Sequence, residues 1–170
     1  MKRWIGPLIV VLVVALLGYG LLNEDSTPKS PLEGKAAPEF NLKSMDGETY
    51  QLASLKGKPV VINFWASWCL PCRVEAPVFR NLIDKSGDQV HYLGISFNDN
   101  EKNAREFLKE FDLNIPTLLD PQSKVAIDYG IGQIPVTLVL DQDGKIVYRH
   151  LGEVDQPTMQ GVLNKLGVKL

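Results

Sequence analysis

The sequence is poor in residues that bind metals or form disulfide bonds. It contains only two cysteines, Cys69 and Cys72, and two histidines, His91 and His150. A zinc site needs about four ligands, and neither histidine stands at a zinc-finger spacing from the cysteines. A metal site is therefore a disfavoured interpretation of the cysteines. What remains to be explained is a pair of cysteines with the spacing C-x-x-C.

The sequence also lacks the patterns of nucleic-acid and nucleotide binding. Its formal net charge is −2, and it contains no basic tail and no Gly-rich phosphate loop. Internal repeats and long low-complexity tracts are missing too. A hydrophobic content of 45% over 170 residues is enough for one domain with an ordinary core. We expect a globular protein with no nucleic-acid partner.

The two cysteines lie on the turn between a predicted strand and a predicted helix. The apolar run Val60–Trp65 before them predicts a buried strand. Cys69 therefore lies at or near the helix N-terminus, where unpaired N–H groups and the helix dipole stabilise negative charge. Because the thiolate is the reactive form of cysteine, this position favours thiol chemistry. The helix itself is predicted by apolar residues at helical spacing: Val74, Val78, Leu82 and Ile83.

On the residues alone, four interpretations of the cysteine pair remain open. The pair could be a redox-active dithiol, a structural disulfide, part of a metal site, or two buried and inert thiols. A structural disulfide across so short a loop would stabilise the fold by only about 2 kcal/mol. Together with the helix N-terminus, this small gain favours the redox-active pair.

The first 37 residues divide into an apolar segment and a polar one. Residues 4–22 are uncharged, with two basic residues before them and two acidic residues after them. At ~1.5 Å per residue this stretch just spans a ~30 Å hydrocarbon core, and the basic end is expected on the cytoplasmic side. We expect residues 1–22 to be an uncleaved signal anchor, a single transmembrane helix, rather than a cleaved signal peptide. Residues 23–37 are then an extracytoplasmic tether.

Residues 38–170 alternate between strand and helix patterns, which is typical of an α/β domain. An Asp46-Gly47 turn between two short runs predicts an N-terminal β-hairpin. The further strands are predicted at 60–65, 90–96, 117–119, 136–140 and 145–149. The further helices are predicted after Asn98-Asp99-Asn100, from Asp120-Pro121, and from Asp155 or Pro157. This order predicts a central mixed sheet with helices on both faces.

The order of elements and the motif residues together resemble the thioredoxin fold. The resemblance is closest to the TlpA/ResA/CcmG (DsbE)-type membrane-anchored thiol–disulfide oxidoreductases. Phe64–Cys72 matches the family's F-W-A-x-W-C-x-P-C, and Gly132–Thr137 matches the loop that carries a cis-proline. Glu75 stands where the family has an active-site acid, and residues 98–130 resemble the insertion that separates this branch from thioredoxin.

The resemblance implies a role for each motif residue. Cys69 would be the nucleophile, Cys72 the resolving thiol, and Glu75 a carboxylate that acts on the proton of Cys72. The fold would need no cofactor besides the Cys69–Cys72 disulfide, and the protein is expected to be a monomer. The residues expected to form the motif surface and the substrate groove are Trp68, Leu70, Pro71, Ile134 and Pro135.

The resemblance also implies partners. The expected substrates are disulfide-bearing extracytoplasmic proteins, with apocytochrome c as one candidate, and the expected electron donor is a membrane thiol relay of the CcdA/DsbD kind. Val136 follows the expected cis-proline where relatives often have Thr or Glu, so the apocytochrome assignment stays open.

Other functions on the same fold are an oxidase or isomerase of folding proteins, a peroxidase, a copper-binding protein and a redox-inert binding module. The P-x-x-x-T-x-x-C context of peroxidatic cysteines is absent, and copper-binding relatives space their cysteines one residue further apart. The intact Trp68-Cys69-Leu70-Pro71-Cys72 motif argues against an inert module. The membrane-anchored family that the sequence resembles is mostly reducing, so the resemblance implies a protein-disulfide reductase rather than an oxidase or isomerase.

Overall fold

A computed structural model describes residues 10, 12–14 and 32–170. Its central strand, β3 (Val60–Trp65), is buried along its whole length, as the apolar sequence predicts. β3 pairs in parallel with β4 (His91–Ser96) and antiparallel with β6 (Val136–Leu140). The mixed five-stranded sheet has the order β5-β4-β3-β6-β7, and its outer strands are β5 (Thr117–Leu119) and β7 (Ile146–Leu151).

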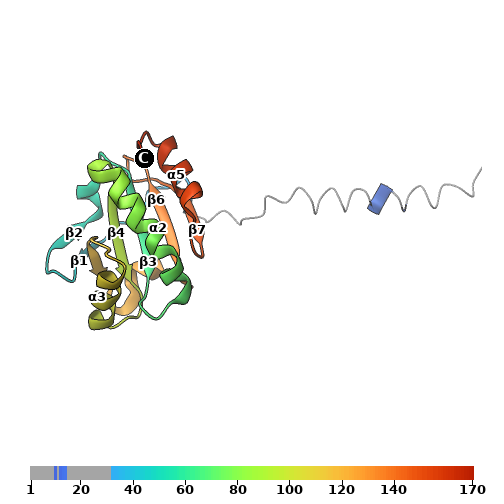
Figure 1. Cartoon of the computed structure of the whole chain (residues 1–170). Helices are drawn as coiled ribbons and strands as arrows, with labels where there is room; N and C mark the ends of the chain where they lie inside the picture. The colour runs from blue at the N-terminus through green and yellow to red at the C-terminus, as the bar shows by residue number, and fades with distance from the viewer. Residues whose placement is uncertain (1–9, 11, 15–31) are drawn as a thin grey trace, which may run out of the picture.

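Three helices cover one face of this sheet, and α2 crosses its centre between α3 and α5 (Figure 1). Their bounds are Leu70–Ser86 for α2, Glu101–Glu110 for α3 and Gln156–Lys165 for α5. Side chains such as Phe79, Phe107 and Leu163 pack from these helices onto the β3 and β6 side chains of this face. We call this layer the α2 face.

The opposite face of the sheet packs against the short helix α4 (Lys124–Asp128), a 3-10 helix at Leu52–Leu55 and the chain around Phe40. Two further 3-10 helices span Gly87–Gln89 and Pro121–Ser123. Helices thus lie on both faces of a mixed sheet, which confirms the predicted thioredoxin-like architecture. We call this second layer the α4 face.

The predicted N-terminal hairpin is confirmed. Strands β1 (Asn41–Lys43) and β2 (Thr49–Gln51) pair antiparallel, and Gly47 in the connecting turn has a φ of 89°, which glycine adopts without steric cost. The Met45 N–H donates to the Thr117 carbonyl at 2.9 Å, so the hairpin is fixed to the edge strand β5.

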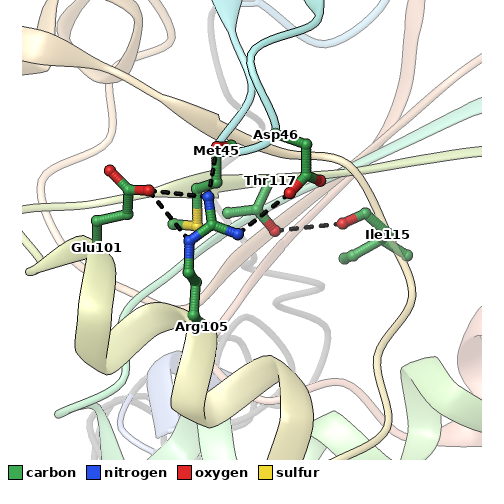
Figure 2. Close-up of polar contacts among 6 residues, drawn as sticks. All are labelled: Met45, Asp46, Glu101, Arg105, Ile115 and Thr117. Carbon is green, nitrogen blue, oxygen red and sulfur yellow. Dashed lines mark hydrogen bonds and ion pairs between the residues drawn. The ribbon is translucent and has the colours of Figure 1, made fainter.

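Arg105 ties the same hairpin to α3. Figure 2 shows its guanidinium donating to the Met45 carbonyl, to Asp46 at 3.1 Å and to Glu101 at 2.8 Å. These groups are exposed, so each ion pair contributes little by itself. Together these contacts hold α3 against the hairpin.

Residues 34–37, at the end of the expected tether, are part of the packed domain. The Gly34 N–H donates to the Ile146 carbonyl at 2.8 Å, and the Ala37 N–H donates to the Gly144 carbonyl at 2.9 Å. Of the expected transmembrane segment, only residues 10 and 12–14 are described, and they are helical. The rest of that prediction lies outside the described residues, among which no helix is long and apolar enough to cross a membrane.

One detail of the predicted helices is wrong. Val74 was expected on the apolar face of the helix after the cysteines, but its side chain is 62% exposed and Ala76 and Phe79 face the core instead.

The helical turn expected from Asp120 and Pro121 is present as the 3-10 helix Pro121–Ser123, with Asp120 as its N-cap residue, and α4 follows it from Lys124. Asp120 also caps α4, because its carboxylate accepts from the N–H groups of residues 125 and 126 at 3.0 and 2.8 Å.

Candidate active site

Cys69 and Cys72 form a disulfide at the N-terminus of α2, with an S–S distance of 2.08 Å. Cys69 is the N-cap residue, and its Sγ accepts a hydrogen bond from the Cys72 N–H at 3.2 Å. Pro71 stands in the first turn, where its missing N–H costs nothing. In the reduced state, a thiolate on Cys69 would lie at the positive end of the helix dipole and accept the same N–H.

A carboxyl group is buried one helical turn beyond the disulfide. Glu75 is 1% exposed, and its carboxylate accepts from Asn63 Nδ2 at 2.9 Å and from the Val154 N–H at 3.1 Å. Burial raises the pKa of Glu75 to about 7, although the two hydrogen bonds oppose this rise. The carboxyl can therefore gain or lose a proton near neutral pH.

Glu75 lies above a row of polar residues that crosses the sheet. Asn63 on β3 is the register partner of Thr137 on β6, which is in turn the partner of His150 on β7. Side chains that pair in register point to the same face of a sheet, and Asn63 Nδ2 contacts both Glu75 and the Thr137 hydroxyl, the latter at 3.1 Å. The apolar α2 face thus contains a polar strip directly beneath the active-site helix.

A small internal cavity connects this strip to the disulfide. Among its lining residues are Cys72, Glu75, Asn63 and Trp65. The Trp65 indole N–H is buried without a hydrogen-bond partner, and Trp65 stacks on Phe107 with ring centroids 4.4 Å apart. Cys72 and Glu75 therefore line the same small, mainly apolar pocket, and because both residues are buried the electrostatic interaction between them is strong.

Exposed apolar side chains surround the disulfide, whose own cysteines are buried. Trp68 and Leu70 are 60% and 72% exposed, and Val74 extends the same exposed side of α2. The Ile134–Pro135 peptide is cis, and it immediately precedes β6, whose first residue pairs with the end of β3. The structure thus brings the two predicted motif segments to the same end of the sheet.

The loop after β4 holds the active-site turn in place. The Ser67 N–H and hydroxyl donate to the Asp99 carboxylate at 2.5 and 2.9 Å, and the Trp68 indole donates to the Asn98 carbonyl at 3.2 Å. Of the three residues expected to cap the next helix, only Asn100 does so, since its side chain accepts from the Lys102 N–H. Asp99 and Asn98 instead support the turn before Cys69.

The sequence reasoning missed three groups of this site. Asn63 and Thr137 are polar residues inside apolar strands, and this interruption was a usable signal for a buried polar contact. The Val154 N–H gave no signal, because any residue except proline supplies one. In the described ranges, no three His, Cys, Asp or Glu side chains gather closely enough to hold a metal ion.

Comparison with known proteins agrees with this geometry. Residues 32–166 match the Redoxin family model. The chain belongs to the Redoxin family. It is 33% identical over 168 residues to the thioredoxin-like protein YneN of Bacillus subtilis, covering 96% of this chain and 98% of that one. It is 30% identical over 161 residues to the thiol-disulfide oxidoreductase ResA of Bacillus cereus, covering 94% and 93%.

The solved structure of dsbF from Mycobacterium tuberculosis (MTB), in its mixed oxidized and reduced forms, is similar with a TM-score of 0.69 and 29% identity. It covers 75% of this chain and 94% of that one. Together these matches and the Cys69–Cys72 pair identify a TlpA/ResA/CcmG-type member of the thioredoxin superfamily. The protein is a thiol–disulfide oxidoreductase.

Proposed function

We propose that this Redoxin-family protein is a membrane-anchored reductase that reduces disulfides in extracytoplasmic proteins. The observation that carries the proposal is the buried Glu75 carboxyl, which lines the same cavity as Cys72 at the N-terminus of α2. A carboxylate there disfavours a second negative charge on Cys72. It therefore destabilises the thiolate form of the reduced protein and makes the dithiol a stronger reductant.

The first step is attack on the partner. The Cys69 thiolate attacks one sulfur of the partner's disulfide, so that a mixed disulfide forms and the partner's second sulfur leaves as a thiolate and takes up a proton. The exposed Trp68 and Leu70 beside Cys69 offer apolar contact to the partner chain. The Ile134–Pro135 segment at the same end of the sheet completes the groove.

The second step is resolution. The Cys72 thiol gives its proton to the Glu75 carboxylate, and the Cys72 thiolate attacks Cys69. The mixed disulfide breaks, the Cys69–Cys72 disulfide forms, and the partner's second sulfur leaves as a thiolate. This thiolate takes up a proton from solvent, and Glu75 returns the Cys72 proton to solvent. Two electrons have then passed to the partner, and its two new thiols have taken their protons from the medium. A carboxyl with a pKa of about 7 suits this proton transfer at neutral pH.

Anchoring and location follow from the N-terminal sequence. Residues 1–22 hold the protein in the cell membrane with the N-terminus in the cytoplasm, and the tether places the catalytic domain on the outer side. A membrane thiol relay of the CcdA/DsbD kind reduces Cys69–Cys72 again, and apocytochrome c is a candidate substrate. The uncharged stretch of residues 4–22 and its charged flanks support this arrangement.

The experiment is to measure the reduction potential of residues 32–170 by equilibration with glutathione or dithiothreitol. Both hydrophobic clusters lie within this range. A value at or below ~ −270 mV supports a reductase, whereas a value near ~ −120 mV contradicts it and indicates an oxidant of folding proteins. Cys72→Ala, which cannot resolve the mixed disulfide, is expected to retain disulfide-bearing envelope proteins covalently on Cys69. Cys69→Ala is the matched control and is expected to retain none.

A further inference from the structure

The loop between β7 and α5 contacts Glu75 through a single peptide group. The Val154 N–H donates to Glu75 Oε2 at 3.1 Å. The carbonyl of the same peptide, on Glu153, contacts His150 Nε2 at 3.0 Å. One peptide group, Glu153–Val154, therefore lies between the histidine and the active-site carboxyl.

The hydrogen bonds select one tautomer of the neutral His150 ring. A carbonyl oxygen only accepts, so Nε2 must carry the proton that it donates to Glu153. In the neutral ring Nδ1 is then an acceptor, and the Tyr148 hydroxyl lies 3.0 Å from it as the donor. The Tyr148 and His150 rings also stack, with centroids 6.1 Å apart. The imidazole is thus held on both nitrogens and on one ring face.

The geometry of a peptide transmits this constraint to Glu75. The Glu153–Val154 peptide is trans and planar, so its C=O and N–H point in opposite directions. When His150 holds the Glu153 carbonyl oxygen in place, the direction of the Val154 N–H is therefore fixed as well. A hydrogen bond to the carbonyl also polarises the N–H and strengthens its bond to an ionised carboxylate.

Both oxygens of Glu75 are supported from the same row of the sheet. Oε1 accepts from Asn63, whose amide also contacts Thr137, and Oε2 accepts from the peptide held by His150. Asn63, Thr137 and His150 are neighbours in register across β3, β6 and β7. Asn63 of this row contacts one carboxylate oxygen directly, and His150 acts on the other through the Glu153–Val154 peptide.

We propose that His150 is a positioning residue for the active-site carboxyl, and that it acts by holding the Glu153–Val154 peptide against Glu75. The role of the Glu75 carboxyl in the thiol chemistry rests on the function proposed above. The positioning of Glu75 by His150 does not depend on that function. Tyr148 contributes by orienting the His150 ring.

Two charged side chains flank this loop. Glu153 is exposed, and its carboxylate adds to the rise in the Glu75 pKa that burial causes. Asp155 is the N-cap of α5, where it accepts from the Thr158 N–H at 2.8 Å and from its hydroxyl at 2.9 Å. These hydrogen bonds lower the pKa of Asp155, so its charge next to His150 stays constant near neutral pH. The far end of the loop is therefore fixed independently of His150.

The test is a titration of the Glu75 carboxyl carbon by NMR, in the full-length protein in detergent with the disulfide formed. His150→Phe keeps a ring but removes both ring nitrogens. Because the Val154 N–H favours ionised Glu75, weakening it is expected to raise the Glu75 midpoint by about one pH unit. A midpoint equal to the wild-type value overturns the proposal.

Two further variants make the test specific. His150→Gln retains an N–H near the position of Nε2, and it is expected to restore a wild-type midpoint. His91→Phe removes the other histidine, which lies on β4 outside this network, and it is expected to leave the midpoint unchanged. A rise of equal size in His91→Phe or in His150→Gln contradicts the proposal, because the effect would then not depend on the hydrogen bond.

Tyr148→Phe provides an independent route if His150→Phe does not fold. It removes only the hydroxyl that orients the imidazole, and a smaller rise in the Glu75 midpoint is expected. Hydrogen exchange at the Val154 amide is expected to accelerate on the order of tenfold, because the peptide that carries this N–H is no longer held against Glu75. An unchanged midpoint together with unchanged Val154 exchange overturns the proposal.

The pH profile of disulfide exchange separates this inference from the proposed function. If His150→Phe raises the Glu75 midpoint and shifts the pH profile of substrate reduction with it, both stand. If the midpoint rises but the profile does not move, His150 still positions Glu75, and the proposed proton transfer through Glu75 fails.

Discussion

Each face of the sheet holds a titratable side chain that is no more than 1% exposed, and the two behave differently. Glu75 on the α2 face is 1% exposed and Tyr129 on the α4 face is 0% exposed. Burial raises the pKa of both side chains. It moves the pKa of Tyr129 further above neutral pH, whereas it brings the pKa of Glu75 to about 7. Tyr129 therefore stays uncharged at any physiological pH, whereas Glu75 exchanges its proton.

The ordinary pKa values of the two groups, 4.5 for the carboxyl and 10.0 for the phenol, are the first reason for this difference, because burial raises both. Tyr129 packs between Phe40 and Phe64, and its hydroxyl donates to the Pro38 carbonyl at 2.7 Å, a bond that only the neutral form can make. Glu75 instead faces two donors, the Asn63 amide and the Val154 N–H, which favour its ionised form and limit the effect of burial. Burial therefore moves the pKa of the carboxyl towards neutral pH and that of the phenol away from it.

The largest expected effect comes from removing the nucleophile on the α2 face. Cys69→Ala is expected to lower the reduction of a protein disulfide on the order of 10³-fold or more, because no other thiol can begin the exchange. The measurement is turnover with dithiothreitol as donor. The control is Ile127→Ala, which truncates a 70% exposed apolar side chain on α4 and is expected to leave turnover unchanged. Residual turnover close to wild type in Cys69→Ala would contradict the assignment of the nucleophile.

Glu75→Gln is expected to change how stability depends on pH. The folded-state pKa is about 7 against an ordinary 4.5, so the folded protein binds this proton more tightly than the unfolded chain. The resulting stabilisation is complete below about pH 4.5 and is lost as pH rises through 7. Relative to wild type, the variant is therefore expected to gain about 3 kcal/mol in the free energy of unfolding between pH 4.5 and pH 8.

Denaturant unfolding of the oxidised protein at several pH values measures this difference. Glu106→Gln, at an exposed position of α3, is the matched control and is expected to show no such gain. A stability difference between wild type and Glu75→Gln that stays constant across this range would mean that Glu75 does not titrate there.

Gly94→Ala is expected to cost about 2 kcal/mol of stability. A Cβ at this position of β4 would lie 2.6 Å from Trp65 Nε1 and 3.0 Å from Thr117 Oγ1, so the buried indole or the strand must move. Since Trp65 lines the cavity next to Cys72 and Glu75, turnover should fall as well.

The matched control for this substitution is Gly161→Ala in α5, where a Cβ meets no atom within 4 Å. That change is expected to raise stability by about 0.5–1 kcal/mol, because alanine favours the helix over the unfolded chain. Equal effects at the two glycines, measured by thermal or denaturant unfolding, would show that the close approach at Gly94 has no consequence.

The smallest effect is expected on the α4 face. Tyr129→Phe removes one hydrogen bond to a backbone carbonyl and should cost about 1 kcal/mol. Because Tyr129 does not titrate near neutral pH, this cost should be the same at pH 5 and pH 8, and turnover should not change. If the loss of stability in Tyr129→Phe depended on pH, Tyr129 would titrate in this range, and the difference between Tyr129 and Glu75 would not hold.

The sequence was sufficient for the features that depend on local pattern. The uninterrupted apolar run of β3 predicted a central strand, the Asp46-Gly47 pair predicted the hairpin turn, and the position of Cys69 after that strand predicted a helix N-terminus. Each of these features depends on residues that are close together in the sequence, and these residues are neighbours in the unfolded chain as well as in the folded one.

Features that depend on tertiary contacts were predicted less well. Val74 has the right spacing for an apolar helix face but lies on the side of α2 that none of the described elements covers, next to the disulfide. The donors to Glu75 come from residues 12 and 79 positions away in the chain. Only the registers of β3, β6 and β7 bring the groups around the carboxyl together.

The most direct test of the account is the rate at which Cys72 resolves the mixed disulfide, measured against pH. Reduced protein is mixed rapidly with a disulfide-bearing peptide, quenched with acid, and the decay of the mixed disulfide is followed in wild type and in Glu75→Gln. The wild-type rate is expected to rise with a midpoint near pH 7, whereas the Glu75→Gln rate is expected to be lower by a factor of about 10² and to lack this midpoint. Equal rates and equal pH profiles in the two proteins would contradict a role for the buried carboxyl in the thiol chemistry.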